Sequence, residues 1–338
     1  MTLHNPVLQN QPSASVRDAG QARDICEPGR VDCAVVVVTY NSASDIAALL
    51  DSLPAAAAGL RIRVIVVDNG STDGTVALVR SRPDVTCVET GTNLGYAGGI
   101  NAGRSRGGDY SALLVLNPDA ELGAGALREM FAALDDPAVG IVVPMLLGAE
   151  GQRLPSLRRE PTLMRALGDG LLGGRIRHRP GWLSEMVWHE RAYRHRHPID
   201  WATGAALLVS DACDRAVGRW DERFFLYSEE TDYFARARAM GFRVDYLPSA
   251  WVRHRGGGSG RSDALLALQA VNRVRYMEKH RRWPRLYWLA VVLHELLRSG
   301  NSGHRAALLA VLHRSRWDSV LGRLQSGSQP AAVMPADR

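Results

Sequence analysis

Hydrophobic residues in the first 150 positions form short unbroken runs that are separated by segments of helical spacing. The runs at 34–38, 63–67 and 112–116 are typical of strands buried on both faces of a sheet. The intervening segments 45–53 and 75–82 carry apolar residues every three or four positions, as a one-sided helix does. This alternation with short loops predicts an α/β fold with a parallel sheet covered by helices on both faces.

The same pattern divides the rest of the chain. Segments 85–89, 139–145, 205–210 and 244–247 predict further strands. Segment 125–134 predicts a helix, and the acidic segment 228–232 leads into another helix that runs to Met240. Segment 147–198 is rich in Arg, His, Gly and Pro without a period, which indicates an irregular excursion that acts as a lid or faces an acceptor. The predicted divisions are a disordered tail at 1–31, an α/β domain at 32–260, a basic helical extension at 261–322 and a flexible tail at 323–338.

Three of the predicted strands end in clusters of polar residues. Thr-Tyr-Asn follows the first at 39–41, Asp-Asn-Gly the second at 68–70, and Asn-Pro-Asp the third at 117–119. Parallel strands bring their carboxyl ends to one edge of the sheet, which is where open α/β sheets bind ligands. Pro118 cannot donate a ladder hydrogen bond, so Asp119 should stand just beyond the strand. We expect Asp119 to hold a divalent cation against a nucleotide diphosphate.

Charge and composition narrow the class of protein. A hydrophobic content of 46% is ample for a folded core, and the net charge is +6. The excess of Arg and His lies in 156–196 and 253–316. These segments either bind a phosphorylated ligand or an anionic lipid, or simply form a solvated charged face. No nucleic-acid recognition motif accompanies this charge, so nucleic acid is not an expected partner.

Cysteine usage and hydropathy bear on location. The four cysteines are widely spaced and form no metal or redox pattern, and no secretory signal is evident. We therefore expect a cytoplasmic protein. No apolar run approaches the roughly 18 residues that span a bilayer. The basic, aromatic segment 281–312 fits either a helix lying on the inner face of the cytoplasmic membrane or an ordinary amphipathic helix packed on the domain.

Other candidate residues have both a structural and a chemical interpretation. Glu229, Glu230 and Asp232 begin a predicted helix, where acids complement the helix dipole, or where one could act as a general base. His254 is a surface histidine of a basic loop or, with Asp119, a metal ligand. The glycine-rich segment 93–101 could bring backbone N–H groups to phosphates at a helix N-terminus. It lacks dinucleotide-binding spacing, and the chain has no P-loop, which weakens dehydrogenase and P-loop interpretations.

Taken in order, these motifs resemble the inverting glycosyltransferase family two, and within it the rhamnosyltransferase-like branch. The resemblance covers roughly 34–257 and rests on segments 38–41, 67–74, 93–101, 116–119, 203–205, 224–232 and 248–254. It implies a GT-A fold with a Rossmann-like, mostly parallel sheet that binds a nucleotide sugar. It also implies a metal-dependent, inverting single displacement that serves cell-envelope or polysaccharide synthesis.

The resemblance assigns a role to each matching residue. The donor side comprises Thr39, Tyr40, Asn41, Asp68, Asn69 and Asn117 for the base, ribose and metal, and Gly95, Gly98 and Asn101 for the phosphates. Asp119 and His254 match the residues that bind Mg²⁺ or Mn²⁺, and Glu230 matches the catalytic base. Trp201, Thr203, Gly204 and Asp232 would lie near the sugar and the acceptor.

Two departures from the family pattern leave questions open. Asn117 replaces the first Asp of the usual Asp-x-Asp motif, and Glu230 stands where the branch usually has Asp. The sequence therefore does not decide whether Glu229 or Glu230 takes the proton.

The substrates follow from resemblance alone. The implied donor is deoxythymidine-diphosphate rhamnose, and the implied acceptor is a glycan or a polyprenyl-linked sugar. One rival is a sugar nucleotidyltransferase, but 39–42 lacks its basic phosphate signature. The other is an inactive module that binds nucleotide sugar or polysaccharide without turnover.

Overall fold

A computed structural model of the chain describes residues 29–172, 176, 179–256, 262–280 and 283–325. Most of the predicted tails at 1–31 and 323–338 lies outside these residues, although the first strand already begins at Val31.

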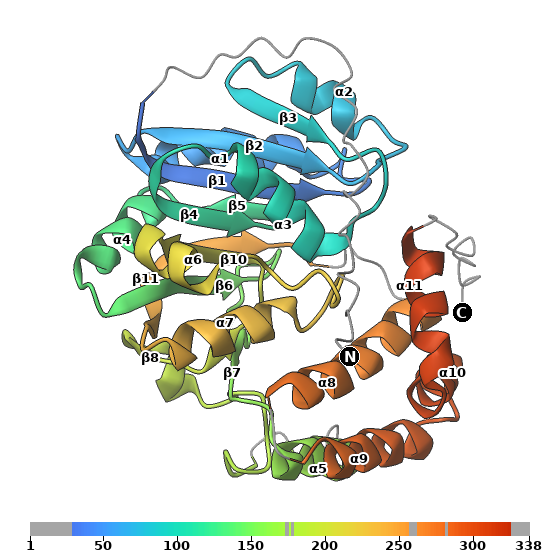
Figure 1. Cartoon of the computed structure of the whole chain (residues 1–338). Coiled ribbons are helices and arrows are strands. Elements are labelled where there is room, and N and C mark those ends of the chain that lie inside the picture. Colours follow the sequence, from blue (N-terminus) through green and yellow to red (C-terminus); the bar gives the residue numbers. More distant parts are fainter. Residues whose placement is uncertain (1–28, 173–175, 177–178, 257–261, 281–282, 326–338) are drawn as a thin grey trace, which may run out of the picture.

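The centre of the fold is a nine-stranded sheet with the order β3-β2-β1-β4-β10-β6-β11-β5, to which β8 adds by pairing with β11 (Figure 1). A separate two-stranded sheet joins β7 and β9. The strands are β1 Val31–Thr39, β2 Ile62–Asp68, β3 Val85–Glu89, β4 Tyr110–Leu116, β5 Ala120–Leu122, β6 Val139–Leu147, β7 Leu157–Arg158, β8 His197–Pro198, β9 Trp201–Ala202, β10 Ala206–Ser210 and β11 Arg243–His254.

Six strands of the main sheet run in one direction, and β10, β5 and β8 run against them. The mostly parallel sheet of the sequence prediction is therefore confirmed. The register sets Thr39 opposite Asp68, and Val37 of β1 opposite Leu116 at the end of β4. The polar residues that follow β1, β2 and β4 consequently meet at one edge of the sheet, as predicted.

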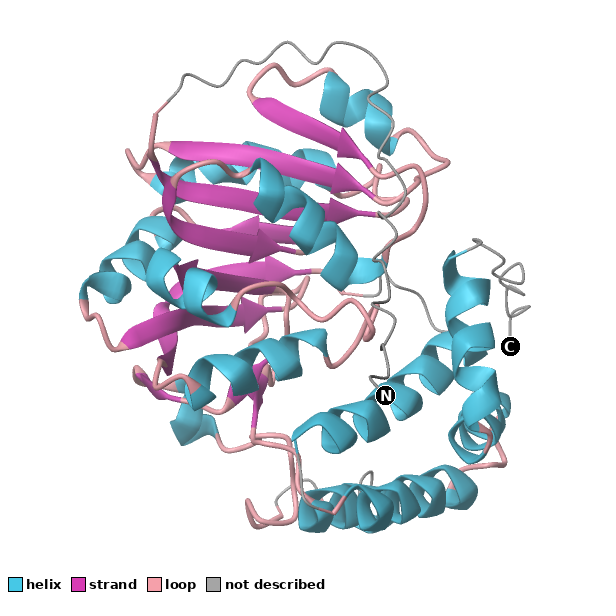
Figure 2. Ribbon diagram, viewed as in Figure 1, coloured by secondary structure: helices cyan, strands magenta, loops and turns pink. Residues whose placement is uncertain are grey.

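Helices cover both faces of the sheet (Figure 2). Helices α1 and α4 bury residues such as Leu49 and Leu127 in the core on one face. Helices α3, α6 and α7 bury residues such as Ile100 and Phe234 in the core on the other face. The helices are α1 Ile46–Ala57, α2 Thr75–Arg80, α3 Gly95–Arg106, α4 Ala126–Ala132, α5 Leu163–Leu172, α6 Asp211–Val217, α7 Glu229–Ala239, α8 Asp263–His280, α9 Pro284–Leu297, α10 Ser302–Leu312 and α11 Trp317–Gln325.

Several elements differ from their predicted bounds. Helix α1 continues past Pro54 to Ala57, because only the Pro54 N–H is lost from its ladder. Strand β11 extends to His254 because Pro248 falls within a register shift between Leu247 and Trp251, where the missing N–H is tolerated. His254 thus ends a strand and is not part of a surface loop.

The excursion at 147–198 is more regular than predicted, since it contains α5 together with β7, β8 and a 3₁₀ turn at Glu190–Tyr193. The C-terminal helices form a third core with α5, built on residues such as Val271, Tyr287 and Ala307. In Figure 1 these helices form a layer beside the sheet domain, with α5 alongside α9. Within the described ranges, no helix combines the length and the hydropathy that crossing a membrane requires.

Candidate active site at the carboxyl edge of the sheet

The first part of the site joins the ends of β1 and β2. Thr39 Oγ1 donates to Asp68 Oδ1 at 3.0 Å, and Asp68 also accepts the backbone N–H of Ser71 at 2.8 Å. Asn69 Nδ2 donates to the carbonyl of Gly95 at the start of α3, at 2.8 Å. These contacts hold buried polar side chains in fixed positions at the sheet edge. Such positions suit recognition of a base or a ribose.

Tyr40 and Asn41 extend this edge toward solvent. Tyr40 is partly exposed, and Asn41 is exposed with a positive φ of 52°. Asn41 is held by Ser71 Oγ, which accepts its N–H at 2.8 Å, and by the N–H of Thr72, which donates to its Oδ1 at 2.8 Å. Its left-handed backbone is a conformation that Asn tolerates better than most residues.

The second part brings Asn117, Asp119 and His254 together from the ends of β4 and β11. His254 Nε2 lies 3.3 Å from Asp119 Oδ1 and 3.3 Å from Asn117 Nδ2. The other oxygen of Asp119 accepts the backbone N–H of Gly256 at 3.0 Å. Burial opposes ionisation, but the hydrogen bonds from His254 and from backbone amides outweigh it and hold the pKa of Asp119 below its usual value. The carboxylate is therefore ionised at neutral pH.

This pair fits a hard divalent cation. Two neighbouring ligands, each about 2.1 Å from one Mg²⁺, are separated by about 3 Å, close to the observed spacing. An ionised carboxylate with one imidazole is a donor set that Mn²⁺ or Mg²⁺ accepts, with remaining positions left for phosphate oxygens.

The third part is the glutamate pair at the start of α7. Glu229 is 3% exposed, whereas Glu230 is partly exposed, and their carboxyl groups are hydrogen-bonded to each other. Burial and the charge of Glu230 raise the pKa of Glu229 well above its usual value. Burial also raises the pKa of Glu230, but the hydrogen bond from Glu229 and the charge of Arg158 oppose that rise. Because the pKa of Glu229 is raised the more strongly, we assign the shared proton to Glu229, with Glu230 accepting its hydrogen bond.

Tyr96 and Gly204 connect the three parts. Tyr96 follows Gly95 in α3, and its hydroxyl donates to the carbonyl of Gly204 at 3.2 Å. Burial and the nearby charges of Glu229, Glu230 and Asp119 raise the pKa of Tyr96 well above its usual range. Gly204 lies against Glu230, because a Cβ built on it would be 3.5 Å from the Glu230 Cβ. Its neighbour Ala205 accepts the N–H of Asn117 at 3.0 Å.

Sequence reasoning missed Tyr96 and Arg158. Tyr96 lies inside the glycine-rich segment that matches the family, and this position is the only sign in the sequence that Tyr96 belongs to the site. Arg158 lies in the excursion that had no readable pattern, and only the fold brings its charge near Glu230. Burial lowers the pKa of Arg158, and its guanidinium donates to the carbonyl of Pro155 at 2.6 Å.

The loop that leads into α7 is held in an unusual conformation. Phe225, Tyr227 and Ser228 have φ angles of 64°, 69° and 69°, which L-residues rarely adopt. Asn272 of α8 is fully buried and donates to the carbonyls of Phe224, Leu226 and Tyr227 at 2.6, 2.9 and 3.0 Å. The C-terminal helices therefore fix the backbone immediately before the glutamate pair.

Three residues predicted to line the donor phosphates have a packing role in the structure. The N–H groups of Tyr96 and Ala97 at the start of α3 donate to the carbonyl of Phe225, so they do not face an open site. A Cβ on Gly95 would lie 2.5 Å from Phe225, and one on Gly98 would lie 2.7 Å from Leu94 Cβ. The glycines therefore permit close contact. Asn101 is buried, with its amide bound to the N–H and carbonyl of Trp220 at 2.9 Å each.

Two residues predicted to meet the sugar or the acceptor are likewise structural. Asp232 is fully buried, ion-paired with Arg236 and Lys279 at 2.8 and 2.6 Å and hydrogen-bonded to His280 at 2.7 Å, which ties α7 to α8. Trp201 packs in the core, with its indole N–H donated to the Arg159 carbonyl at 2.9 Å. Thr203, by contrast, is partly exposed one residue before Gly204, and its hydroxyl donates to the Ser156 carbonyl at 3.2 Å.

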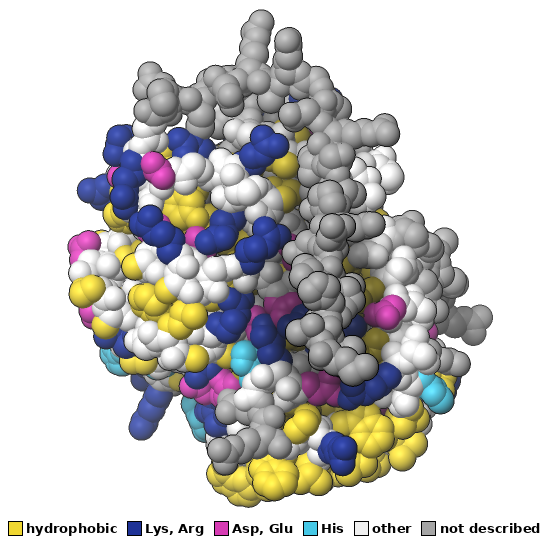
Figure 3. Space-filling model, in the orientation of Figure 1, with side chains coloured by type: hydrophobic (Ala, Val, Ile, Leu, Met, Phe, Trp, Pro, Cys, Tyr) yellow, Lys and Arg dark blue, Asp and Glu magenta, His cyan; other side chains and the backbone are white. Residues whose placement is uncertain are grey.

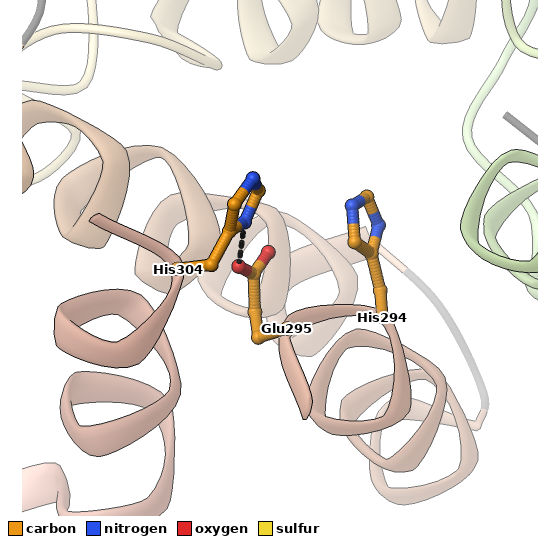
Figure 4. Close-up of side chains that lie close together, drawn as sticks. All are labelled: His294, Glu295 and His304. Atoms are coloured by element: carbon orange, nitrogen blue, oxygen red, sulfur yellow. Dashed lines mark hydrogen bonds and ion pairs between the residues drawn. The ribbon is translucent and has the colours of Figure 1, made fainter. Parts of the chain in front are cut away.

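A separate group of potential metal ligands lies in the C-terminal helices (Figure 4). The ligand atoms of His294, Glu295 and His304 all lie within 4.8 Å of one another, and His304 Nδ1 is 2.7 Å from Glu295. Burial and the charges of Arg273 and Arg298 lower the pKa of His294 to about 3. Because this positive field also repels a cation, we assign no metal to the group.

Comparison with known proteins identifies the family. Residues 34–196 match Glycosyl transferase family 2. The N-acetylglucosaminyl-diphospho-decaprenol L-rhamnosyltransferase of Mycobacterium tuberculosis is 32% identical over 287 residues, which cover 78% of this chain and 92% of that protein. The chain belongs to glycosyltransferase family 2. The family and the rhamnosyltransferase-like branch predicted from the motifs are thereby confirmed, and the chain is a glycosyltransferase.

Further relatives of this glycosyltransferase agree. The low-salt glycan biosynthesis hexosyltransferase Agl10 of Haloferax volcanii is 29% identical over 217 residues, covering 63% of this chain and 64% of that protein. Among solved structures, GalNAc-T7 with UDP, GalNAc and Mn²⁺ gives a TM-score of 0.57 at 13% identity, over 88% of this chain and 58% of that one. The mannosyltransferase PcManGT from Pyrobaculum calidifontis, with GDP-Man and Mn²⁺, gives 0.51 at 17% identity over 89% of each chain. These structural likenesses confirm the predicted GT-A fold.

Proposed function

We propose that this glycosyltransferase transfers L-rhamnose from deoxythymidine-diphosphate rhamnose to a hydroxyl of a polyprenyl-linked sugar, with inversion and with a divalent metal. The observation that carries the proposal is the meeting of Asp119 and His254 with Glu230 around Tyr96 and Gly204 at one sheet edge. The sugar and the acceptor class rest on the mycobacterial relative, which is named for rhamnosyl transfer to a diphospho-decaprenol-linked sugar.

The donor end of the proposed site is assigned by chemistry. Thr39, Tyr40, Asn41, Asp68 and Asn69 offer donors and acceptors for the base and the ribose. Asp119 and His254 would hold Mg²⁺ or Mn²⁺, with Asn117 beside them. A bound cation neutralises charge on the departing diphosphate. Structures of this fold that contain Mn²⁺ and a nucleotide or nucleotide sugar support a metal here.

Glu230 is the proposed base, and Glu229 positions it. A general base must be ionised and must be within reach of the acceptor. Glu230 meets both requirements better than Glu229 does, because it is partly exposed and because its carboxylate accepts a hydrogen bond from Glu229. Glu229 has neither property, since it is buried and protonated. Among the described residues, Oε2 of each glutamate is buried without a hydrogen-bond partner, so Glu230 retains an acceptor atom that no described residue uses.

The proposed reaction balances as a single displacement. The acceptor oxygen forms a bond to the anomeric carbon while the bond from that carbon to the β-phosphate oxygen breaks. The electron pair of the broken bond leaves with the nucleoside diphosphate, and the acceptor proton passes to Glu230. Attack from the face opposite the leaving group inverts the anomeric centre. General-base help of this kind contributes about 10²–10⁴-fold in rate.

The test is a transfer assay with the full chain. Deoxythymidine-diphosphate rhamnose is supplied with polyprenyl-diphosphate N-acetylglucosamine and Mn²⁺ or Mg²⁺, and nucleoside diphosphate release is measured together with the product anomer. Rhamnosylated product with an inverted anomeric centre is expected, and it should disappear with a chelator. Binding of the donor without turnover would favour the inactive module instead.

A further inference from the structure

Large exposed apolar side chains are concentrated on one part of the surface. Of the fifteen in the part of the chain that the structure describes, ten lie on α5, on α9 or on the segments next to them. The space-filling view shows them gathered along the lower edge of the molecule, where Figure 1 has α5 and α9 (Figure 3). We call this surface the α5–α9 face; its residues are Met164, Leu171, Ile176, Trp182, Trp283, Leu286, Leu289, Leu293, Leu296 and Leu297.

Helix α9 is apolar on two sides, one buried and one exposed. Tyr287, Ala290 and Val291 are buried in the core of the C-terminal helices. Leu286, Leu289 and Leu293, followed by Leu296 and Leu297, form an exposed stripe at spacings of three and four residues. A helix packed only on its own domain needs one apolar side, so the second side is left for something outside the described fold.

Helix α5 continues the exposed stripe. A Cβ on Gly170 of α5 would lie 3.4 Å from His294 Cβ of α9, so the two helices are in close contact. A Cβ on Gly168 would collide with the carbonyl of Leu183, which sets the segment carrying Trp182 against α5. The excursion and the C-terminal extension therefore build one continuous face.

The charges on the two helices favour an anionic partner. Their two acids are already engaged, Asp169 with Arg179 and Glu295 with His304. Arg285 is exposed beside Trp283 and Leu286, and Arg298 follows the end of α9. An apolar stripe with aromatic and cationic residues at its borders matches the boundary between headgroups and acyl chains of an anionic bilayer.

We propose that the α5–α9 face docks this enzyme on the surface of an anionic lipid bilayer. The inference rests on the proposed lipid-linked acceptor, which would lie in that bilayer. Docking would also orient the site, because α8 packs against α9 and holds the loop before Glu229 through Asn272.

Vesicle flotation of the full chain tests the proposal. Wild-type protein should float with vesicles of phosphatidylcholine and phosphatidylglycerol, more weakly with phosphatidylcholine alone, and less at raised ionic strength. The variant L289E/L293E should lose at least roughly tenfold in partition, since each leucine no longer inserts. The matched control, L78E/M240E, changes two exposed apolar residues outside the face and should float as wild type does.

Transfer assays separate this proposal from the proposed function. L289E/L293E should act normally on a detergent-solubilised acceptor and at least tenfold more slowly on the same acceptor in vesicles. Wild-type protein that transfers rhamnose but does not float, or a double variant that floats unchanged, would overturn docking and leave the function intact. A wild-type dimer that L289E/L293E dissociates would mean that a second copy covers the face. Flotation without any transfer would leave docking standing and contradict the function.

Discussion

At the scale of single residues, surroundings separate two neighbouring glutamates that look equivalent in the sequence. Glu229 points into the protein and Glu230 is partly exposed, although both begin α7. Their position at the start of a helix and their likeness to a family motif are evident from the sequence. The difference in burial between Glu229 and Glu230, which decides the assignment of the proton, is evident only in the structure.

Substitution of each glutamate by glutamine should therefore have unequal effects. E230Q removes the proposed base, and we expect transfer to fall by about 10²–10⁴-fold with nucleotide binding retained. E229Q still donates a hydrogen bond to Glu230, so we expect transfer within about tenfold of wild type. Initial rates and donor affinity measured on both variants check this. A larger loss for E229Q than for E230Q would reverse the two roles.

Protein stability should report the proton on Glu229 independently of activity. Because its pKa is raised by folding, the native state binds a proton that the unfolded chain releases above its ordinary pKa of 4.5. The contribution of Glu229 to the free energy of unfolding therefore falls as pH rises, by at most about 1.4 kcal/mol per pH unit.

We thus expect E229Q to be more stable than wild type at pH 8 and to lose that advantage near pH 4. Denaturant unfolding at several pH values measures the difference. A pH-independent difference would show that Glu229 is ionised in the folded protein.

Asp119 was predictable from its place after a buried run, and the structure adds its partners. We expect D119N to abolish the metal-dependent part of nucleotide binding, since a neutral amide replaces an ionised ligand. Calorimetry with nucleoside diphosphate and Mn²⁺ measures this, and D84N, which changes an exposed acid, is the control. Equal affinity of D119N and wild type in Mn²⁺ would remove Asp119 from the metal site.

At the scale of elements, prediction succeeded where hydrophobic runs were long and failed where packing overrides local signals. Strands β1, β2 and β4 were found from their valines and leucines. Strand β11 was cut short because Pro248 is a strand breaker except at an irregularity, which only pairing reveals. Asn101 and Asp232 are bound by other elements, which a polar residue in a motif does not reveal, and their roles at the substrate stay predictions.

Asn272 offers a test of the contact between α8 and the loop that leads into α7. N272A leaves the carbonyls of Phe224, Leu226 and Tyr227 without their donor, so we expect a loss of roughly 1–3 kcal/mol in stability and a lower kcat. N301A removes the cap of α10, where the Asn301 side chain accepts the Gly303 N–H, at a cost of about 0.5–2 kcal/mol. Rates compared at a temperature where both variants are folded should fall only for N272A. Equal kcat values would mean that the loop keeps its shape without Asn272.

At the scale of the whole molecule, the sequence identified the family because many weak motifs occur in a fixed order. The excursion and the C-terminal extension were harder, since neither carries a family motif and their helices are apolar on exposed sides as well as buried ones. Their cooperation in one core and one surface follows from contacts between residues more than a hundred positions apart, such as Gly170 with His294. The spacing of hydrophobic residues within either segment does not predict such a long-range contact.

The proposed site at the sheet edge brings a metal-bound sugar diphosphate together with Glu230 as the general base. The most direct measurement is the rate and stereochemistry of rhamnosyl transfer from deoxythymidine-diphosphate rhamnose to polyprenyl-diphosphate N-acetylglucosamine, compared among wild type, E230Q and D119N. We expect metal-dependent transfer with inversion by wild type and near-complete loss in both variants. Transfer with retention, or undiminished transfer by E230Q, would contradict it.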